Sequence, residues 1–300
     1  MTIASEITDL QNNLAAAKAA VTAKGGTVGD TGLAGLASEI ASIPSGGSLT
    51  DYGSIKYLDG NNVEQTLTLA TATDFFELTL GGSGSDITIN SVTINKNNIT
   101  EVTVADGVMY LPNNFCYGCN FMTKATLPSS ILYIGNGVFS YTTINNELTL
   151  TNVEYIGNDF MRSNSQYNQP TNLPKIVNIG SNFLGSCTSY NSALSLGNSL
   201  KAIDQRFLYG CTSFAQNLTL PSSIEYTIGS YFMYNCKQFV GPLVCNSNKV
   251  AADNNTLSTN DNAALMYTTG VTLTGAYAQS WKDTFPDRTS SPYRNLIIGS

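Results

Sequence analysis

Histidine is absent from this 300-residue sequence. The chain therefore lacks the commonest general base at neutral pH, the usual partner of a Ser or Cys nucleophile, and the commonest zinc ligand. Charged residues make up only 12% of the chain, which is well below the usual quarter. The net charge is −7, and no cluster of Lys and Arg is present that could displace counterions from phosphates. These absences argue against most enzyme classes and against a nucleic-acid interface.

Long apolar runs are also missing. No window approaches the roughly 18–20 apolar residues that a membrane span requires, so no membrane insertion is expected. The first ten residues carry Glu6 and Asp9 and lack an apolar core, so a secretory signal peptide is not expected. Apolar residues nevertheless make up 42% of the chain, and this length is ample for a continuous core. With so few charges, Asn, Ser, Thr and Gly must hydrate the surface, which suits turn-rich β architecture.

Residues 1–44 are predicted to form a helical segment, with helices over 3–21 and 31–43. Gly25-Gly26 ends the first helix, and residues 45–48 follow as a linker. The apolar stripe of the first helix is narrow, which favours self-association or docking over a helical hairpin packed on its own domain. We therefore expect a homo-oligomer, with a trimer as one possible form. The stripe has the alternating steps of coiled-coil a and d positions: Ile3, Ile7, Leu10, Leu14, Ala17 and Val21.

Residues 49–107 are predicted to be β-rich. Three segments alternate with period two, at 66–69, 76–80 and 87–94. Asp59-Gly60 and the glycine-rich stretch 81–84 supply turns. The region is either a small antiparallel sheet or the first coils of a solenoid.

A repeat over residues 108–246 sets the predicted fold, which is a mainly β solenoid of about six coils. Four or five residues before each repeated Phe stands an aliphatic residue, usually followed by Gly. Four residues after it comes Cys, except that Thr143 and Asn164 take this position in two copies. An aromatic residue and a short Leu-x-Leu strand follow. No single repeat can bury this face alone, so neighbouring repeats must stack. The repeated phenylalanines are Phe115, Phe139, Phe160, Phe183, Phe207 and Phe232.

This pattern resembles the BspA-like leucine-rich repeat family over about residues 108–246. The resemblance implies a leucine-rich-repeat solenoid with a surface or adhesive role. Residues 247–300 are similar to the loop, short helix and last strand that close such arrays. The segment from Leu14 to Ile40 resembles the leading part of phage virion proteins, in which two helices precede a variable fibre or decoration domain.

The cysteines are predicted to pack in the core. Cys116 and Cys119 have the spacing of metal ligands, but no second close pair and no His accompany them. The other repeat cysteines recur about one coil apart, as in an interior ladder. Disulfides between coils and a metal site remain the alternatives. We expect no metal and no cofactor.

Tyrosines near the repeated Phe form the candidate contact surface. A ridge of rigid, amphipathic rings would suit a glycan or a protein ligand. The alternative is that each ring only covers its own coil. The residues are Tyr117, Tyr141, Tyr167, Tyr209 and Tyr234.

The leading hypothesis is a phage virion structural protein, a fibre or decoration protein that is made in the host cytoplasm and carried on the extracellular particle. The N-terminal helices would bind capsid or tail proteins, and the repeats would bind a host surface glycan or protein without catalysis. The alternative is a bacterial or protist cell-surface adhesin. A third, less favoured hypothesis is a carbohydrate-active enzyme that uses pairs of carboxylates.

Overall fold

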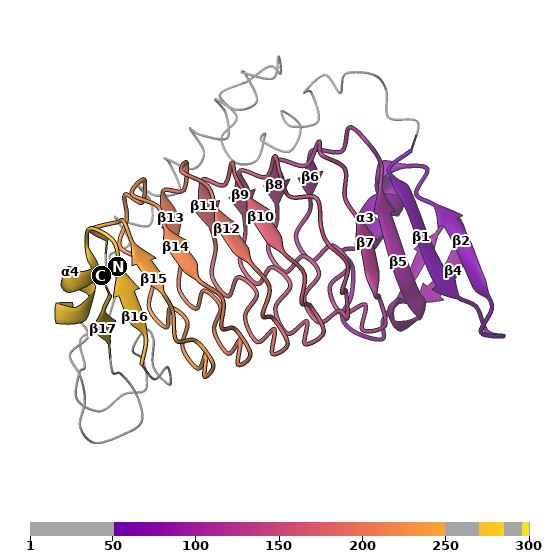
Figure 1. Ribbon diagram of the computed structural model, residues 1–300. Helices are drawn as coiled ribbons and strands as arrows, with labels where there is room; N and C mark the ends of the chain where they lie inside the picture. Colours follow the sequence, from indigo (N-terminus) through magenta and orange to yellow (C-terminus); the bar gives the residue numbers. More distant parts are fainter. Residues whose placement is uncertain (1–50, 250–269, 285–295, 300) are drawn as a thin grey trace, which may run out of the picture. The chain divides into compact units, whose positions relative to one another are not determined.

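The computed structural model describes residues 51–249, 270–284 and 296–299 (Figure 1). These residues form a mainly β structure, a β-solenoid of about seven turns with few helices. The helices predicted at 3–21 and 31–43, including the stripe that begins at Ile3, lie outside the described residues and stay predictions.

The region before the repeats combines the two predicted alternatives. Strand β1 (Gly53–Leu58) pairs antiparallel with β2 (Glu64–Thr68) and with β5 (Ile99–Val104). Strand β5 then pairs in parallel with β7 (Lys124–Thr126), which belongs to the first repeat. The small antiparallel sheet is therefore continuous with the solenoid through β5, and it covers the solenoid's first coil.

The segment 87–94, predicted as one alternating run, is a hairpin. Strand β3 (Asp86–Ile89) and strand β4 (Val92–Asn95) pair antiparallel on either side of Asn90 and Ser91. Both turn residues have a left-handed backbone, with φ of 50° and 66°. Two consecutive left-handed residues give the turn that matches the twist of paired strands.

The alternating pattern at 76–80 predicted a strand, and this prediction is wrong. Helix α3 (Ala72–Glu77) occupies part of this stretch. Its N-terminus is a capping box, in which Asp74 N donates to Thr71 Oγ1 at 3.1 Å and Thr71 N donates to the Asp74 carboxylate at 2.9 Å. The 3₁₀ helix η1 (Lys96–Asn98) then leads into β5.

Each coil of the solenoid adds short strands to parallel ladders (Figure 1). One ladder has five strands, β6 (Tyr110–Leu111), β8 (Tyr133–Ile134), β9 (Tyr155–Ile156), β11 (Asn178–Ile179) and β13 (Ala202–Ile203). On another side of the coils, β10 (Thr171–Leu173) pairs with β12 (Leu194–Leu196). The remaining strands form a four-stranded ladder of β14 (Leu218–Leu220), β15 (Leu243–Cys245), β16 (Thr272–Thr274) and β17 (Ile297–Ile298).

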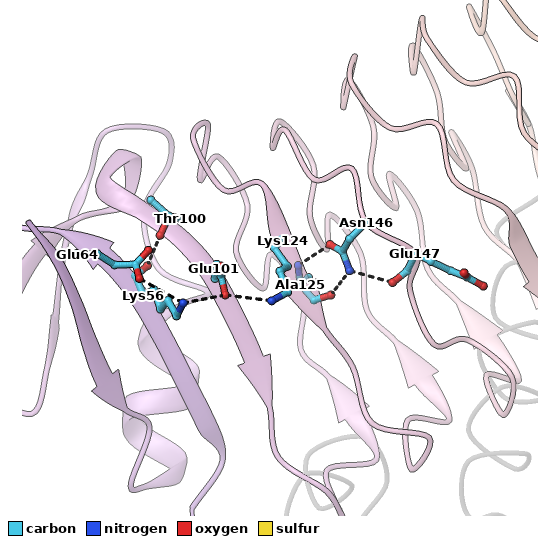
Figure 2. Close-up of polar contacts among 8 residues, drawn as sticks. All are labelled: Lys56, Glu64, Thr100, Glu101, Lys124, Ala125, Asn146 and Glu147. Atoms are coloured by element: carbon cyan, nitrogen blue, oxygen red, sulfur yellow. Dashed lines mark hydrogen bonds and ion pairs between the residues drawn. The ribbon is translucent and has the colours of Figure 1, made fainter. Parts of the chain in front are cut away.

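A row of polar contacts marks the junction between the antiparallel sheet and the repeats (Figure 2). Lys56 pairs with Glu64 at 3.2 Å and with Glu101 at 3.6 Å, and Lys124 pairs with Glu101 at 3.5 Å. Exposed pairs of this kind contribute at most about 1 kcal/mol each, so they favour the register of the strands more than they stabilise the fold.

The parallel ladder is interrupted beyond β7, and the side chain of Asn146 satisfies the backbone there (Figure 2). Its Oδ1 accepts from Ala125 N at 3.0 Å, and its Nδ2 donates to Ala125 O at 2.8 Å and to Glu147 O at 2.9 Å. One amide thus replaces both hydrogen bonds that a neighbouring strand would make with Ala125.

The second coil has a register that differs by one residue from the sequence alignment. Met161 N donates to Val138 O just as Leu184 N donates to Phe160 O, so Val138 and not Phe139 takes the repeated Phe position. Both side chains are fully buried, which is why apolar pattern alone did not separate them. We call this position the anchor of each coil. The six anchors are Phe115, Val138, Phe160, Phe183, Phe207 and Phe232.

The corrected register also moves the cysteine position of the second coil from Thr143 to Thr142. Thr142 is 2% exposed, and its Oγ1 donates to Phe139 O at 2.9 Å. In later coils the cysteine donates across coils: Cys187 Sγ to Met161 O at 3.2 Å and Cys211 Sγ to Leu184 O at 3.0 Å. All six cysteines are free and buried, as the packing hypothesis predicted.

Two columns of aromatic rings run through the interior. In the first, Phe183 stacks on Phe160 and Phe207, with ring centroids 5.9 and 5.5 Å apart. Helix α4 (Ala278–Thr284) places Trp281 at the end of this column, 5.9 Å from Phe232, and so covers the last anchor. The second column consists of Tyr167, Tyr190, Phe214 and Phe239, at centroid separations of 5.7–5.8 Å.

Candidate binding surface

The chain turns sharply around each anchor, and the backbone there alternates between left-handed and other conformations. The residues one before, one after and three after the anchor have φ between 52° and 72° in each of the six coils that carry an anchor. A non-glycine residue in this conformation costs roughly 1–2 kcal/mol. The eighteen residues are Asn114, Cys116, Gly118, Gly137, Phe139, Tyr141, Asp159, Met161, Ser163, Asn182, Leu184, Ser186, Arg206, Leu208, Gly210, Tyr231, Met233 and Asn235.

Hydrogen bonds between coils hold this backbone in place. In the third coil, Asp159 N and Ser163 N donate to Ser181 O and Gly185 O of the following coil, both at 2.7 Å. Met161 N donates in the other direction, to Val138 O of the preceding coil, at 2.9 Å. Because the same conformation recurs in every coil, it is a property of the architecture and does not mark a single site. We call the surface formed by these turns the turn edge.

The residue two after the anchor lies between two left-handed residues at the tip of each turn. It is Tyr117, Ser140, Arg162, Gly185, Tyr209 or Tyr234 in successive coils. Three of the five predicted contact tyrosines therefore share one position, and Tyr141 lies next to it because of the register of its coil. The structure brings these four tyrosines to the turn edge, in two groups.

The first group, the N-proximal cluster, consists of Tyr117, Tyr141 and Arg162. The two tyrosine rings meet edge to face at 5.4 Å, and Tyr141 is 38% exposed. The Arg162 guanidinium lies 6.0 Å from the Tyr141 ring centroid and 3.6 Å from the Asp159 carboxylate. A cation near a tyrosine face is held by the ring quadrupole, so this arginine is oriented along the turn edge.

The second group, the C-proximal cluster, consists of Arg206, Tyr209, Tyr231 and Tyr234. The rings of Tyr209 and Tyr234 stack at 5.1 Å with an interplanar angle of 6°. Tyr231 lies 5.8 Å from Tyr234, nearly perpendicular to it, and carries the Arg206 guanidinium at 5.3 Å. Three half-buried rings and one cation therefore form a continuous aromatic surface.

One coil with a small turn separates the clusters. Its tip residue is Gly185, and its Asn182 donates to Asp159 Oδ1 at 2.9 Å. Arg162 and Tyr209 flank this coil, two coil spacings apart, which corresponds to about 10 Å at the usual strand separation.

Tyr167 was predicted as a surface residue, and this prediction is wrong. The side chain is 1% exposed and its ring stacks on Tyr190 at 5.8 Å, in the second interior column. Its hydroxyl lies 3.2 Å from Thr171 Oγ1. The sequence held the relevant signal, because Tyr167 and Tyr190 both stand seven residues after an anchor.

Buried tyrosines and cysteines make the fold sensitive to alkali. Burial raises the pKa of Tyr167 to about 12 and the pKa of Cys211 to about 12, from ordinary values near 10 and 9. Their contribution to stability is fully present below pH 9 and is lost as the pH rises towards 12, because the unfolded chain ionises first. Each group removes up to about 1.4 kcal/mol per pH unit in that window.

Denaturant unfolding from about pH 8 upwards measures this loss. Tyr167→Phe should reduce the alkaline slope by the share of one group. Equal slopes in the wild type and Tyr167→Phe would contradict the assignment.

Several residues of the candidate surfaces were not predicted from the sequence. Arg162 belongs to the N-proximal cluster and Arg206 to the C-proximal cluster. Neither arginine was predicted, because isolated cations carry no periodic signal.

Three tyrosines also align along the five-stranded ladder, where Tyr110 pairs with Tyr133 and Tyr133 with Tyr155. Each directly precedes the aliphatic residue of its repeat, which was a usable signal. Tyr133 and Tyr155 stack at 5.2 Å, and burial, followed by the nearby charge of Glu154, raises the pKa of Tyr133 to about 12.

Two other features are absent from the described part of the chain. No group of three or more His, Cys, Asp or Glu side chains there is placed to hold a metal ion. Among the same residues, no helix has the length and apolar character to cross a membrane.

Parallel ladders, stacked anchors and a repeated turn together define a leucine-rich-repeat solenoid protein. The chain belongs to the BspA-type leucine-rich repeat family, whose model matches in six copies over residues 81–191 and 168–260.

The crystal structure of a leucine-rich cell surface protein from Faecalibacterium prausnitzii is similar to this chain, with 15% sequence identity and a TM-score of 0.44. The match covers 78% of this chain and 74% of that protein. No curated protein matches the sequence. None of these findings supports the resemblance of the N-terminal segment to phage virion proteins.

Proposed function

We propose that the chain is a non-catalytic binding protein that acts at a cell surface and recognises a glycan along its turn edge. The observation that carries the proposal is the C-proximal cluster, where three tyrosines and Arg206 form one surface on a rigid repeat array. Membership in the BspA-type family supports the cell-surface context, because proteins with such repeats are typically surface or adhesive.

The chemistry of both clusters suits sugars. Tyrosine offers a large, rigid apolar face together with a hydroxyl, and it loses little conformational entropy on binding. Arginine adds a fork of hydrogen-bond donors that are always charged. The intercoil hydrogen bonds fix the turn backbone before a ligand arrives, so binding does not have to pay for ordering it.

The spacing of the clusters favours a ligand with repeating units. One oligosaccharide can contact two subsites that lie about 10 Å apart on one rigid edge, and the second contact is then intramolecular. Affinity for an oligosaccharide should therefore exceed affinity for its monosaccharide by more than the individual contacts explain.

The experiment is a glycan array probed with the labelled full chain, followed by titration calorimetry on the best ligand. Tyr209→Ala should raise Kd about tenfold, as for a well-packed contact residue, and Arg206→Ala should have a similar effect. Tyr226→Ala is the matched control, since Tyr226 is an exposed tyrosine outside both clusters.

Two outcomes would overturn the proposal. The turn edge is not the binding surface if Tyr209→Ala and Arg206→Ala bind like the wild type while Tyr226→Ala does not. Release of reducing sugar from the bound glycan by the wild-type chain would instead show that the protein is an enzyme.

The virion hypothesis remains a prediction. Its partners would bind through the N-terminal stripe from Ile3 to Val21, which lies outside the described residues. Light scattering on the full chain tests the associated homo-oligomer, and a monomeric mass would contradict it.

A further inference from the structure

Two cysteines of the first coil share one tight turn. Cys119 N donates to Cys116 O at 3.4 Å, which closes the four-residue segment Cys-Tyr-Gly-Cys. Cys116 and Gly118 both have a left-handed backbone, with φ of 53° and 72°. A turn of this kind holds its first and fourth Cα atoms within about 7 Å, which overlaps the range of roughly 4.4–6.8 Å that a disulfide spans.

A buried lysine lies beside this turn. Lys96 is 0% exposed, and its Nζ donates to Leu80 O at 3.0 Å and to Leu78 O at 3.4 Å. Leu78 O also accepts from Cys116 N at 3.0 Å, so the ammonium and the first cysteine of the turn meet at one carbonyl oxygen. These carbonyls follow the C-terminus of α3, where a cation is favourable.

The ammonium has one remaining donor and needs a negative partner. A lysine carries three N–H donors, and burying its charge is costly unless it is compensated. Within the described part of the chain, Lys96 forms no ion pair with a carboxylate. A thiolate in the adjacent turn can fill this role.

The two thiols differ in their electrostatics. A hydrogen bond from Cys116, assisted by the charge of Lys96, lowers the pKa of Cys119, whereas burial raises the pKa of Cys116. One sulfur is therefore suited to attack and the other to hold its proton. Burial raises the pKa of Cys187, Cys211 and Cys236, so these thiols are not suited to attack.

A glycine-rich loop covers the turn. A Cβ on Gly118 would lie 2.7 Å from Ser83 N and 2.9 Å from Ser83 Cα, so the loop 81–85 packs directly on it. Side-chain hydrogen bonds hold the loop there, from Asn120 Nδ2 to Ser83 Oγ at 2.6 Å and from Ser83 Oγ to Asn97 Oδ1 at 3.3 Å. The loop contains three glycines and buries no apolar side chain, so its opening breaks hydrogen bonds but exposes little apolar surface of its own.

We propose that Cys116 and Cys119 are a redox-active dithiol, with the Lys96 ammonium as counterion and the loop 81–85 controlling access, and that a small disulfide such as oxidised glutathione is the oxidant. The dithiol proposal does not rest on the proposed glycan binding, although the same turn carries Tyr117 of the N-proximal cluster. Oxidation would form a disulfide within the first coil, next to the antiparallel sheet.

The reaction proceeds by two exchanges. The Cys119 thiolate attacks one sulfur of oxidised glutathione, which forms a mixed disulfide and releases a glutathione thiolate. That thiolate takes the proton of Cys116, and the Cys116 sulfur then attacks the Cys119 sulfur. The Cys116–Cys119 disulfide forms and the second glutathione leaves as its thiolate, so the two cysteines supply the two electrons that reduce the oxidant.

The test uses the native full chain equilibrated with oxidised glutathione, followed by mass spectrometry and peptide mapping. The expected result is the loss of two thiols, a Cys116–Cys119 link, and free cysteines at the other four positions. Cys116→Ser should stop at one glutathione bound to Cys119, and Cys119→Ser should react far more slowly. Lys96→Met should slow oxidation about tenfold.

Two results would overturn the proposal. One is that all six thiols stay reduced in the native chain while the denatured chain oxidises under the same conditions. The other is that the linked cysteines are Cys187, Cys211 or Cys236. If Lys96→Met fails to fold, the difference between Cys116→Ser and Cys119→Ser decides the matter, because it requires no change at Lys96.

Discussion

Phe183→Ala is expected to lower the free energy of unfolding by about 4 kcal/mol, as for the truncation of a large core aromatic. The Phe183 side chain is 0% exposed, and its ring stacks on Phe160 on one side and Phe207 on the other. Its removal leaves a cavity in the middle of the interior column and deprives both neighbours of a stacking partner. The coils on either side are tied by backbone hydrogen bonds, so they cannot collapse into the cavity.

Denaturant unfolding, followed by circular dichroism, measures this effect. Phe121→Ala is the matched control because Phe121 belongs to the first repeat but is 63% exposed, and its stability should change by less than about 0.5 kcal/mol. A second transition is expected in Phe183→Ala, because each coil contacts only its neighbours and the array can separate at the weakened interface. Equal losses of unfolding free energy in the two variants would show that the interior aromatic column does not stabilise the fold more than an exposed side chain does.

Gly229→Ala is expected to destabilise the protein by about 3 kcal/mol, at the upper end for overpacking. A Cβ at Gly229 would lie 2.2 Å from Gln205 N, 2.4 Å from Asp204 C and 2.5 Å from Gln205 Cα. All three are backbone atoms of the preceding coil, so no side-chain movement can relieve the contact. The backbone at Gly229 is not left-handed, so the expected loss reflects space alone.

Gly60→Ala provides the control for this glycine. A Cβ at Gly60 meets nothing within 4 Å, and the residue lies in the turn between β1 and β2. Its stability should stay within about 0.5 kcal/mol of the wild type. If both alanine variants keep the wild-type midpoint, the close approach of the two coils at Gly229 is contradicted.

The repeat could be predicted from the sequence because the same burial requirement recurs in every coil. The aliphatic residue before the anchor, the buried cysteines and the interior aromatics beginning at Tyr190 all follow from stacking. The closing Trp281 could also be expected, since the last coil would otherwise expose its apolar face. Periodicity is informative here because one error in register would expose a whole face to water.

The register of the second coil could not be predicted in the same way. Val138 and Phe139 are both apolar and both fully buried, so either could be aligned with the other anchors. Only the hydrogen bonds to neighbouring coils distinguish them. The wrong prediction for Tyr167, in contrast, could have been avoided from the sequence. Its offset of seven residues from Phe160 matches that of Tyr190 from Phe183.

The candidate surface depends on features that have no sequence period. Arg162 and Arg206 occupy different positions relative to their anchors, yet each lies against a tyrosine ring. Their role follows from the alternating backbone of the turns, which no composition or spacing predicts. Helix α3 was missed because the capping box at Thr71 and Asp74 outweighed a short alternating pattern that began at Phe76.

The single coil that carries Gly185 sets the distance between the two clusters, and this distance can change only by whole coils. Each coil adds one strand spacing of about 4.8 Å and makes the same contacts with its neighbours on both sides. Duplication or loss of one repeat would therefore move the two tyrosine–arginine clusters apart or together by one such step, without altering either cluster or either end of the array. On the proposed glycan-binding function, the number of coils would select among ligands of different repeat length and leave every residue of the two clusters unchanged.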